Sequence, residues 1–326
     1  MGALEDNSIR LQVIVPAHNA EPTLPACIDA LFAAGFRADG ILVVDDGSGD
    51  RTGAIARAAG LRVKRHDIAQ RPARARNAGA AEVDADVLVF IDADVVVHPD
   101  LQSKIRRHFA DPSVSAVIGS YDANPGGPVV SRYRNLLHHV THQKAGGKSQ
   151  TFWSGIGAIR QETFEAAGGF DPAWEDIEDV ELGLRVTEAG GTILLDPTMQ
   201  GTHLKLWTVR SMFRTDLFGR AVPWTRLMRA GRLRVGTLNT AWAHRVSAAC
   251  VLFGAIALAA SPFEVRALWG VAGAAVGFAI ANATLLRRFS RIADPVFAVQ
   301  SMPFHIVHYT AAVLGYLRVR LFERSA

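Results

Sequence analysis

The sequence predicts an α/β fold built on a mainly parallel sheet, followed by an α-helical membrane tail. Residues 11–91 alternate short runs rich in β-branched residues with helix-like segments, which is the pattern of a parallel sheet with crossover helices. Residues 246–326 contain long uncharged runs, and the whole chain has 49% hydrophobic residues and a mean hydropathy of +0.14. This composition excludes a disordered or a collagen-like chain.

The elements of the α/β part follow one another as strand, loop and helix. The predicted strands are Leu11–Val15, Ile41–Val44 and Val87–Ile91, and the predicted helices are Leu24–Ala34 and Thr52–Ala59. Asp50 is placed to cap the second helix and Gly60 to end it. Because ligands of such sheets bind at the carboxyl ends of the strands, we expect the chemistry in the loops after these three strands.

Two uncharged segments of the tail are long enough to cross a bilayer. Val246–Phe263 has 18 residues and Ala267–Leu286 has 20, near the roughly 20 residues that a spanning helix needs. A third apolar segment, residues 295–317, carries two histidines and is interrupted by Pro303. We expect this segment to be re-entrant or interfacial, with a plain third span as the alternative.

Charge is divided unevenly along the chain. Residues 1–200 carry 19 Lys and Arg against 27 Asp and Glu, whereas residues 201–326 carry 16 against 4. The arginines of the second part accompany apolar runs rather than an aromatic binding face, which argues against nucleic acid as a partner. A basic, apolar tail instead favours contact with membrane lipid of anionic character.

The same arginines predict the topology and the domain boundaries. Both flanks of the two predicted spans are basic, so both belong in the cytosol by the positive-inside rule. These residues are Arg226, Arg229, Arg232, Arg234 and Arg245 before the first span and Arg287, Arg288 and Arg291 after the second. Thr208–Met228 has apolar residues at helical spacing and predicts an interfacial amphipathic helix, with a helix packed on the globular part as the alternative. We therefore expect an α/β domain over residues 1–205, an amphipathic linker over 206–245 and transmembrane or re-entrant helices over 246–326.

Cysteine usage and the N-terminal residues favour a cytosolic α/β part. Cys27 and Cys250 lie 223 positions apart and match no disulfide framework or zinc spacing. Met1–Arg10 contains two acidic residues and no apolar run, so no signal peptide is expected. The prediction is a multi-pass protein of the cell (plasma or inner) membrane whose α/β domain faces the cytosol.

Two carboxylates follow the third predicted strand. Asp92 and Asp94 flank one small residue at the end of an apolar run. Oxygen ligands with open water positions suit Mg²⁺ or Mn²⁺ bound jointly with a substrate diphosphate. A lone Asp-x-Asp is more often a solvated strand end, so this prediction depends on the surrounding motifs.

Four motifs occur in order along the α/β part. They are Pro16-Ala17-His18-Asn19-Ala20-Glu21, Asp45-Asp46-Gly47-Ser48-Gly49-Asp50-Arg51-Thr52, Ala75-Arg76-Asn77-Ala78-Gly79 and Asp92-Ala93-Asp94. With these motifs the sequence resembles the family 2 inverting glycosyltransferases of the GT-A fold, over about residues 9–205. The resemblance implies that residues 1–205 form a Rossmann-like GT-A catalytic domain that binds a nucleotide sugar.

The resemblance also implies the donor-binding and metal-binding residues. Asp46 would accept hydrogen bonds from the nucleotide base, and Arg76 would meet the diphosphate. Asp94 would hold the metal, with His203 as a second ligand. The expected donor-binding residues are Pro16, Asn19, Glu21, Asp46, Arg76 and Asp92. Glu21 departs slightly from the family, because many relatives place this acid next to the Asn.

The general base and the acceptor side follow from two later segments. Ile177–Arg185 resembles the Glu-Asp motif of the family at a helix start, which matches Asp179 to the general base. The residues expected beside the donor sugar and acceptor are Trp153, Gly155 and Glu178. His138, His139 and His142 are also expected on the acceptor side and without a metal, because no Glu lies between them as in a zinc protease.

Together these assignments predict a membrane-bound, metal-dependent transferase. It would move one sugar from a UDP-, GDP- or dTDP-sugar to a lipid-linked or glycan acceptor near the membrane, with inversion and with Mn²⁺ or Mg²⁺, in envelope polysaccharide synthesis. A processive polysaccharide synthase is the nearest alternative, but its Gln-x-x-Arg-Trp motif is replaced by Arg220-Ala221-Val222-Pro223-Trp224. Further alternatives are an inactive membrane protein that only binds nucleotide sugar or glycan, and a nucleotidyltransferase.

Overall fold

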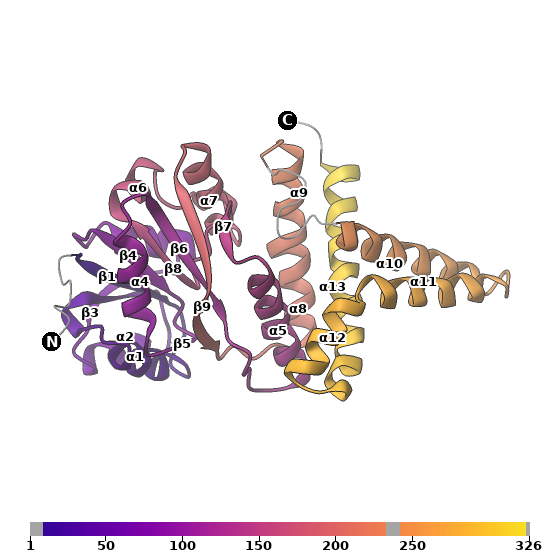
Figure 1. Cartoon of the computed structure of the whole chain (residues 1–326), viewed down its shortest axis with the longest axis horizontal. Helices are drawn as coiled ribbons and strands as arrows, with labels where there is room; N and C mark the ends of the chain where they lie inside the picture. Colours follow the sequence, from indigo (N-terminus) through magenta and orange to yellow (C-terminus); the bar gives the residue numbers. More distant parts are fainter. Residues whose placement is uncertain (1–8, 233–241, 324–326) are drawn as a thin grey trace. The chain divides into compact units, whose positions relative to one another are not determined.

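The structure, a computed structural model, describes residues 9–232 and 242–323 and divides the chain into two units (Figure 1). The first unit comprises residues up to 125 together with 141–205, and the second comprises residues 126–140 and 206–326. Helix α5 (Val129–Lys144) contributes residues to both units. Part of the predicted linker, residues 233–241 with Arg234 among them, lies outside the described residues, as do residues 1–8.

A nine-stranded sheet forms the centre of the first unit within the described ranges. Its order is β3-β2-β1-β4-β8-β6-β9-β5, and β7 pairs with β9. The strands are β1 (Leu11–Ala17), β2 (Ile41–Asp46), β3 (Arg62–His66), β4 (Val87–Ile91), β5 (Val95–Val97), β6 (Val114–Tyr121), β7 (Gly147–Ser149), β8 (Ile156–Arg160) and β9 (Thr192–His203).

One half of this sheet is parallel, as the sequence predicts. Strands β3, β2, β1 and β4 are neighbours and all run in the same direction. The three predicted strands are present as β1, β2 and β4, and the first two extend to Ala17 and Asp46. The carboxyl ends of these strands therefore lie at one edge, where the motifs follow.

The other half of the sheet is mixed, so the prediction of a mainly parallel sheet is wrong for that half. Strand β8 runs antiparallel to both β4 and β6, and β9 pairs parallel with β6 but antiparallel with β5 and β7. The predicted strand Thr192–Leu195 is only the first part of β9, which continues to His203. The pairing of β9 with β6 shifts register between Ile118 and Ser120, which accommodates the longer strand.

Helices cover both faces of the sheet in the first unit. Alternate residues of β1 separate the two cores: Val13 and Val15 pack with α1 and α4, whereas Ile14 packs with α3, α6 and α7. The helices are α1 (Leu24–Ala33), α2 (Thr52–Ala58), α3 (Pro72–Ala80), α4 (Leu101–Phe109), α6 (Gln161–Ala166) and α7 (Glu178–Glu188). The N-cap residue of α2 is Arg51 and not Asp50 as predicted; Asp50 lies one residue earlier, where its carboxylate accepts a hydrogen bond from the Thr52 amide (2.9 Å).

The second unit is helical. Its helices are α8 (Val209–Asp216), the π-helical turn η3 (Leu217–Ala221), α9 (Val222–Arg229), α10 (Trp242–Ala260), α11 (Ala267–Ala281), α12 (Ala283–Ile292) and α13 (Pro295–Phe322), together with the first part of α5. The segment predicted as one amphipathic helix is α8, η3 and α9 in succession. Asp216 at the end of α8 is buried and forms an ion pair with Arg134 of α5 (2.6 Å), so α8 packs against helices of its own unit.

Among the described residues, one helix, α10, is long and apolar enough to cross a membrane. Helices α11 and α12 meet that criterion only together and are bent by 59° at Asn282, so the predicted second span, Ala267–Leu286, is not a single helix. The Asn282 side chain donates to the Phe278 carbonyl oxygen (2.8 Å) and to Ser247 Oγ of α10 (2.9 Å), and these bonds hold the break in place.

Helix α13 also differs from its prediction. It is one continuous helix of 28 residues that includes Pro303, whereas a re-entrant segment has to turn back within its own length. The prediction of a re-entrant segment over residues 295–317 is therefore wrong. The interfacial alternative is left, because α13 is long enough for a span but does not meet the hydropathy criterion that α10 meets. In Figure 1, α10 and α11 run side by side as a hairpin within the second unit.

Candidate active site

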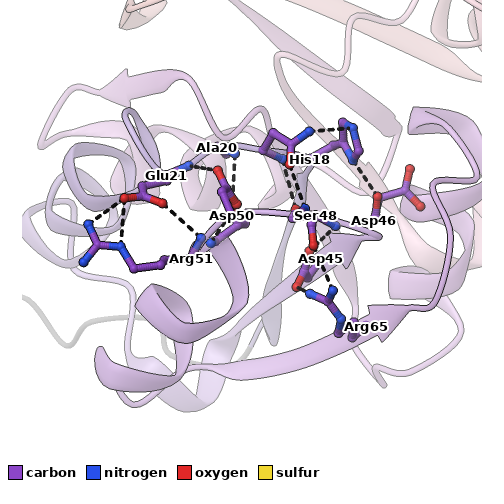
Figure 2. A network of polar contacts seen from close by, with 12 residues as sticks. His18, Ala20, Glu21, Asp45, Asp46, Ser48, Asp50, Arg51 and Arg65 are labelled. Carbon is purple, nitrogen blue, oxygen red and sulfur yellow. Dashed lines mark hydrogen bonds and ion pairs between the residues drawn. The ribbon is translucent and has the colours of Figure 1, made fainter.

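The loops after β1 and β2 interlock at the carboxyl edge of the sheet (Figure 2). Asn19 has a positive φ of 49°. Its side-chain Oδ1 accepts a hydrogen bond from the backbone amide of Gly49 (2.9 Å), and its backbone amide donates to Ser48 Oγ (3.0 Å). Glu21 forms an ion pair with Arg51 (2.6 Å) and accepts a hydrogen bond from the Arg51 amide (3.0 Å). Asn19 and Glu21 therefore hold the loop after β1 against the loop after β2.

Asp46 is the last residue of β2 and is almost completely buried, as is its neighbour Asp45. Its Oδ1 accepts from the Gln70 amide (2.9 Å) and from His66 Nδ1 (2.7 Å), and its Oδ2 accepts from the Arg71 amide (2.8 Å). His18 Nδ1 donates to the Asp46 carbonyl oxygen (2.7 Å), as Figure 2 shows. Asp46 is therefore a fixed acceptor at the strand end, between two histidines.

Asp94 and His203 are brought together by the pairing of β5 with β9. Val95 lies opposite His203 in this antiparallel pair, which leaves 3.4 Å between Asp94 Oδ2 and His203 Nε2. Burial acts to raise the pKa of Asp94, but His203 and Lys205 act more strongly in the opposite direction, and the pKa lies below its ordinary value. Asp94 is thus a carboxylate at neutral pH, with an imidazole beside it.

This pair suits a divalent cation that is shared with a substrate. Among residues 9–232 and 242–323, no three His, Cys, Asp or Glu side chains are grouped closely enough to hold a metal by themselves. One carboxylate oxygen and one imidazole nitrogen leave most of the coordination positions of Mn²⁺ or Mg²⁺ for phosphate oxygens and water. The residues present therefore fit an ion that binds together with a diphosphate.

Arg76 links the metal side of the site to the start of α7. It is buried in α3; its Nη2 donates to Asp92 Oδ1 (2.8 Å) and its Nη1 donates to Glu178 Oε1 (2.7 Å). Burial opposes the charge on Arg76, but Asp92, Glu178 and Asp179 outweigh it and raise the pKa of the guanidinium. Arg76 thus bridges two acids that lie far apart in the sequence, and its predicted contact with a diphosphate stays a prediction.

Asp179 is half-buried in the first turn of α7 and is held at both carboxylate oxygens. Oδ2 accepts from the amide and the hydroxyl of Ser154 (3.2 Å each), and Oδ1 accepts from the Val180 amide (2.7 Å). Burial raises the pKa of Asp179, against the opposing effect of Arg76. Burial and the adjacent Asp179 raise the pKa of Glu178 to about 7. Carboxylates with raised pKa values in a fixed orientation are suited to proton transfer.

The predicted acceptor-side residues come from three places: Trp153 and Gly155 lie in the loop before β8, Glu178 begins α7, and the histidines lie in α5. The backbone of Gly155 packs closely against the indole of Trp153. An added Cβ at this position would lie 2.5 Å from Cζ2 of Trp153, so packing requires glycine here. His142 Nδ1 donates to the Gly119 carbonyl oxygen (2.9 Å) in the first unit, whereas His138 and His139 belong to the second unit. Pro16 is half-buried within β1, opposite Val44 of β2.

Sequence reasoning missed three residues of this site. His66 ends β3, a strand with three charged residues that does not look apolar, and the strand-end rule would find it once β3 is recognised. Ser154 lies between the two predicted residues Trp153 and Gly155. Tyr121 ends β6 and stacks on His203, a contact for which the sequence carries no signal because the two residues are 82 positions apart.

Comparison with known proteins agrees with this geometry. Residues 12–168 match the family model described as glycosyl transferase family 2. The chain is 25% identical over 237 residues to the O-antigen chain rhamnosyltransferase RfbN of Salmonella typhimurium, which covers 66% of this chain and 74% of RfbN. It is also 29% identical over 149 residues to an undecaprenyl-phosphate 4-deoxy-4-formamido-L-arabinose transferase of Yersinia pestis, which covers 43% of this chain and 45% of that protein.

Solved structures show the same fold. The mannosyltransferase PcManGT of Pyrobaculum calidifontis, solved with GDP-Man and Mn²⁺, superposes with a TM-score of 0.60 at 19% identity. The match covers 95% of this chain and 87% of that protein, and at this identity it establishes the fold and not the ligands.

Proposed function

Because the chain is a family 2 glycosyltransferase of the GT-A fold, we propose that it transfers a single sugar from a nucleotide diphosphate sugar to a membrane-proximal acceptor, with inversion. One observation carries the proposal: the bridge of Arg76 between Asp92 and Glu178. This bridge joins the Asp-x-Asp loop, the Ala-Arg-Asn helix and the Glu-Asp helix start, which are separate in the sequence. The three motifs therefore act at one centre.

The proposed chemistry is one displacement at the anomeric carbon of the donor sugar. The acceptor oxygen forms the new bond to this carbon and loses its proton to Asp179, while the electron pair of the broken bond leaves with the diphosphate. The Ser154 amide and hydroxyl hold Asp179 in one orientation, and Arg76 fixes the neighbouring Glu178. A single displacement with a base on one side of the sugar inverts its configuration.

The donor side would use Asp46 for the base and Asp94 with His203 for Mn²⁺ or Mg²⁺. The ion, when bound, neutralises charge on the departing diphosphate. Asn19, Glu21 and Pro16 shape the loops around Asp46, and the contacts of Asn19 and Glu21 favour a supporting role for them. The hydrogen bond from Arg76 fixes the orientation of Asp92, which would then lie on the side of the donor ribose or of the metal.

We further propose that the acceptor is lipid-linked and that the chain is a membrane protein of the cell envelope with its α/β part in the cytosol. Three observations support this: the apolar helix α10, the basic composition of residues 201–326, and the undecaprenyl-phosphate transferase among the relatives. Residues 1–205 would then be the catalytic domain, 206–245 a membrane-surface linker and 246–326 the membrane part. UDP-, GDP- and dTDP-sugars are the donor candidates.

The test uses the full chain purified in detergent and a panel of UDP-, GDP- and dTDP-sugars, with and without Mn²⁺. Release of the nucleoside diphosphate in the presence of a polyprenyl phosphate or a membrane glycan extract identifies donor and acceptor. The proposal expects one sugar added per acceptor, whereas a ladder of longer products indicates the processive alternative. Mn²⁺-dependent nucleotide binding without turnover on any acceptor indicates the inactive binding protein.

A further inference from the structure

Four aromatic rings of the first unit form a connected group, which we call the aromatic stack: His142, Trp153, Tyr121 and His203. The rings of Tyr121 and His203 are parallel within 7° and their centroids are 4.3 Å apart. Trp153 meets Tyr121 edge to face at 4.9 Å, and His142 meets Trp153 edge to face at 5.3 Å. The two edge-to-face contacts have favourable aromatic geometry and the Tyr121 and His203 rings are in close stacked contact, so the stack is a continuous packed path.

The sheet explains why Tyr121 lies on His203. Strand β6 runs parallel to β9 with Tyr121 opposite Gly201, and His203 is the next residue of β9 on the same face. Gly201 has no side chain, and an added Cβ would lie 2.9 Å from Cγ1 of Val95. The Tyr121 ring can therefore extend past Gly201, which has no side chain, and stack on the imidazole of His203.

We propose that Tyr121 is a positioning residue that fixes the imidazole of His203 in the orientation required to ligate a divalent metal together with Asp94. This inference rests on the proposed metal site. A histidine ring packed flat against a buried tyrosine cannot rotate without displacing it, so the ligand is ordered before the metal arrives. Binding then costs less ordering entropy. His203 Nε2 is the nitrogen that faces Asp94, at 3.4 Å.

The far end of the stack is anchored in the same unit. His142 Nδ1 donates to the Gly119 carbonyl oxygen of β6 (2.9 Å), which holds the His142 ring against Trp153. Trp153 in turn is seated over Gly155, where a side chain would collide with the indole. Trp153 thus packs edge to face against Tyr121 and restricts the movement of the Tyr121 ring.

The loop that carries Trp153 also contacts the proposed general base, Asp179. Ser154, whose amide and hydroxyl hold Asp179, directly follows Trp153. One short loop therefore orients the proposed metal ligand through Trp153 and Tyr121, and the proposed base through Ser154. A change at Gly155 that displaces the indole is expected to reach His203 through Trp153 and Tyr121. The Gly155 carbonyl oxygen also accepts a hydrogen bond from the Asp92 amide (3.4 Å), and an Ala side chain leaves this backbone contact in place.

The test measures Mn²⁺ binding to the full chain in detergent, from the electron paramagnetic resonance signal of the free ion, with and without a nucleoside diphosphate. Tyr121→Ala should weaken Mn²⁺ binding by about tenfold, the lower end of the effect of residues that orient metal ligands. Tyr121→Phe keeps the ring and should bind Mn²⁺ within about twofold of the wild type. Phe109→Leu, a change at a buried aromatic residue outside the stack, is the control for general loss of packing.

His203→Ala separates this inference from the metal site on which it rests. If His203→Ala binds Mn²⁺ as the wild type does, the metal site itself is wrong. If His203→Ala loses affinity while Tyr121→Ala retains it, the positioning role of Tyr121 is refuted and the site stands. Should Tyr121→Ala fail to fold, Gly155→Ala decides: lowered Mn²⁺ affinity in a folded protein supports the stack, and unchanged affinity overturns it.

Discussion

Replacement of Asp179 by Asn is the most direct perturbation of the proposed base. Asn has nearly the same shape but cannot accept a proton from the acceptor hydroxyl. We expect transfer to fall by about 10² to 10⁴-fold, the usual contribution of a general base. Donor binding should be unchanged, because none of the described hydrogen bonds of Asp179 goes to Asp46, Asp94 or His203.

The expected effect on stability can be worked out from the contacts of Asp179. Its two oxygens accept three hydrogen bonds, and an amide can accept only at one of these positions. With the amide oxygen toward Val180, the NH₂ group faces Ser154, whose hydroxyl can turn to accept but whose amide loses its partner. This costs about 1 kcal/mol.

A second effect depends on pH and has the opposite sign. The pKa of Glu178 is raised to about 7, by burial first and by Asp179 in addition, so the folded wild type loses stability as pH rises through this value. The Asn variant removes one like charge, so the pKa of Glu178 falls and less stability is lost. Relative to the wild type, the variant should become more stable as pH rises from 4.5, the ordinary pKa of Glu178, to about 7.

The assay is nucleoside diphosphate release and product formation from pH 5 to 9, with thermal unfolding and donor calorimetry on the same samples. Wild-type turnover should fall on the acidic side as Asp179 becomes protonated, and residual turnover of Asp179→Asn should lack this limb. Glu181→Gln is the matched control, because Glu181 is a buried acid of the same helix that pairs with Arg185. Equal loss of donor affinity and turnover in Asp179→Asn would refute its assignment as the base.

Three further outcomes are expected. Asp94→Ala should abolish Mn²⁺-dependent nucleotide binding, and unchanged binding in calorimetry would remove Asp94 from the metal site. Arg76→Met leaves the buried Glu178 and the half-buried Asp92 without their cation, so we expect a loss of about 3 kcal/mol in unfolding free energy and a transfer rate lowered at least tenfold; a variant with normal turnover would show that the bridge is only structural. Asp216→Asn breaks the buried pair with Arg134 and should lower unfolding free energy by about 3 kcal/mol at pH 7. Because the pKa of Asp216 is depressed to about 2 despite its burial, its contribution is present at neutral pH and is lost as pH falls toward that value, so a pH-independent difference would contradict this assignment.

The sequence alone determined three of the four strands of the parallel half, β1, β2 and β4, and most of the residues at its edge. Val87–Ile91 is apolar throughout and buried on both faces, as expected for a strand that helices cover on both sides. The strand ends follow from where the apolar run stops, which places Asp46, Asp92 and Asp94 at one edge. The helical tail also followed from composition.

Only the tertiary structure decided which of these residues contact one another. Strand β8 enters between β4 and β6 in the antiparallel direction, and no local pattern of residues 156–160 fixes that direction or its register. This insertion, with the pairing of β9 to β5 and β6, places His203 between Asp94 and Tyr121. The contact of Arg76 with Glu178 likewise depends on segments about 100 positions apart, which the sequence could not pair.

The physical reason is the difference between local and long-range terms. Burial periodicity, capping and turn formation depend on residues within a few positions of one another, so a single sequence reveals them. Ion pairs, stacked rings and strand order depend on the register between distant segments, where a shift of one residue turns each side chain to the other face. The helix break at Asn282 belongs to the second kind, because its side chain bonds to Ser247 and His305 on two other helices.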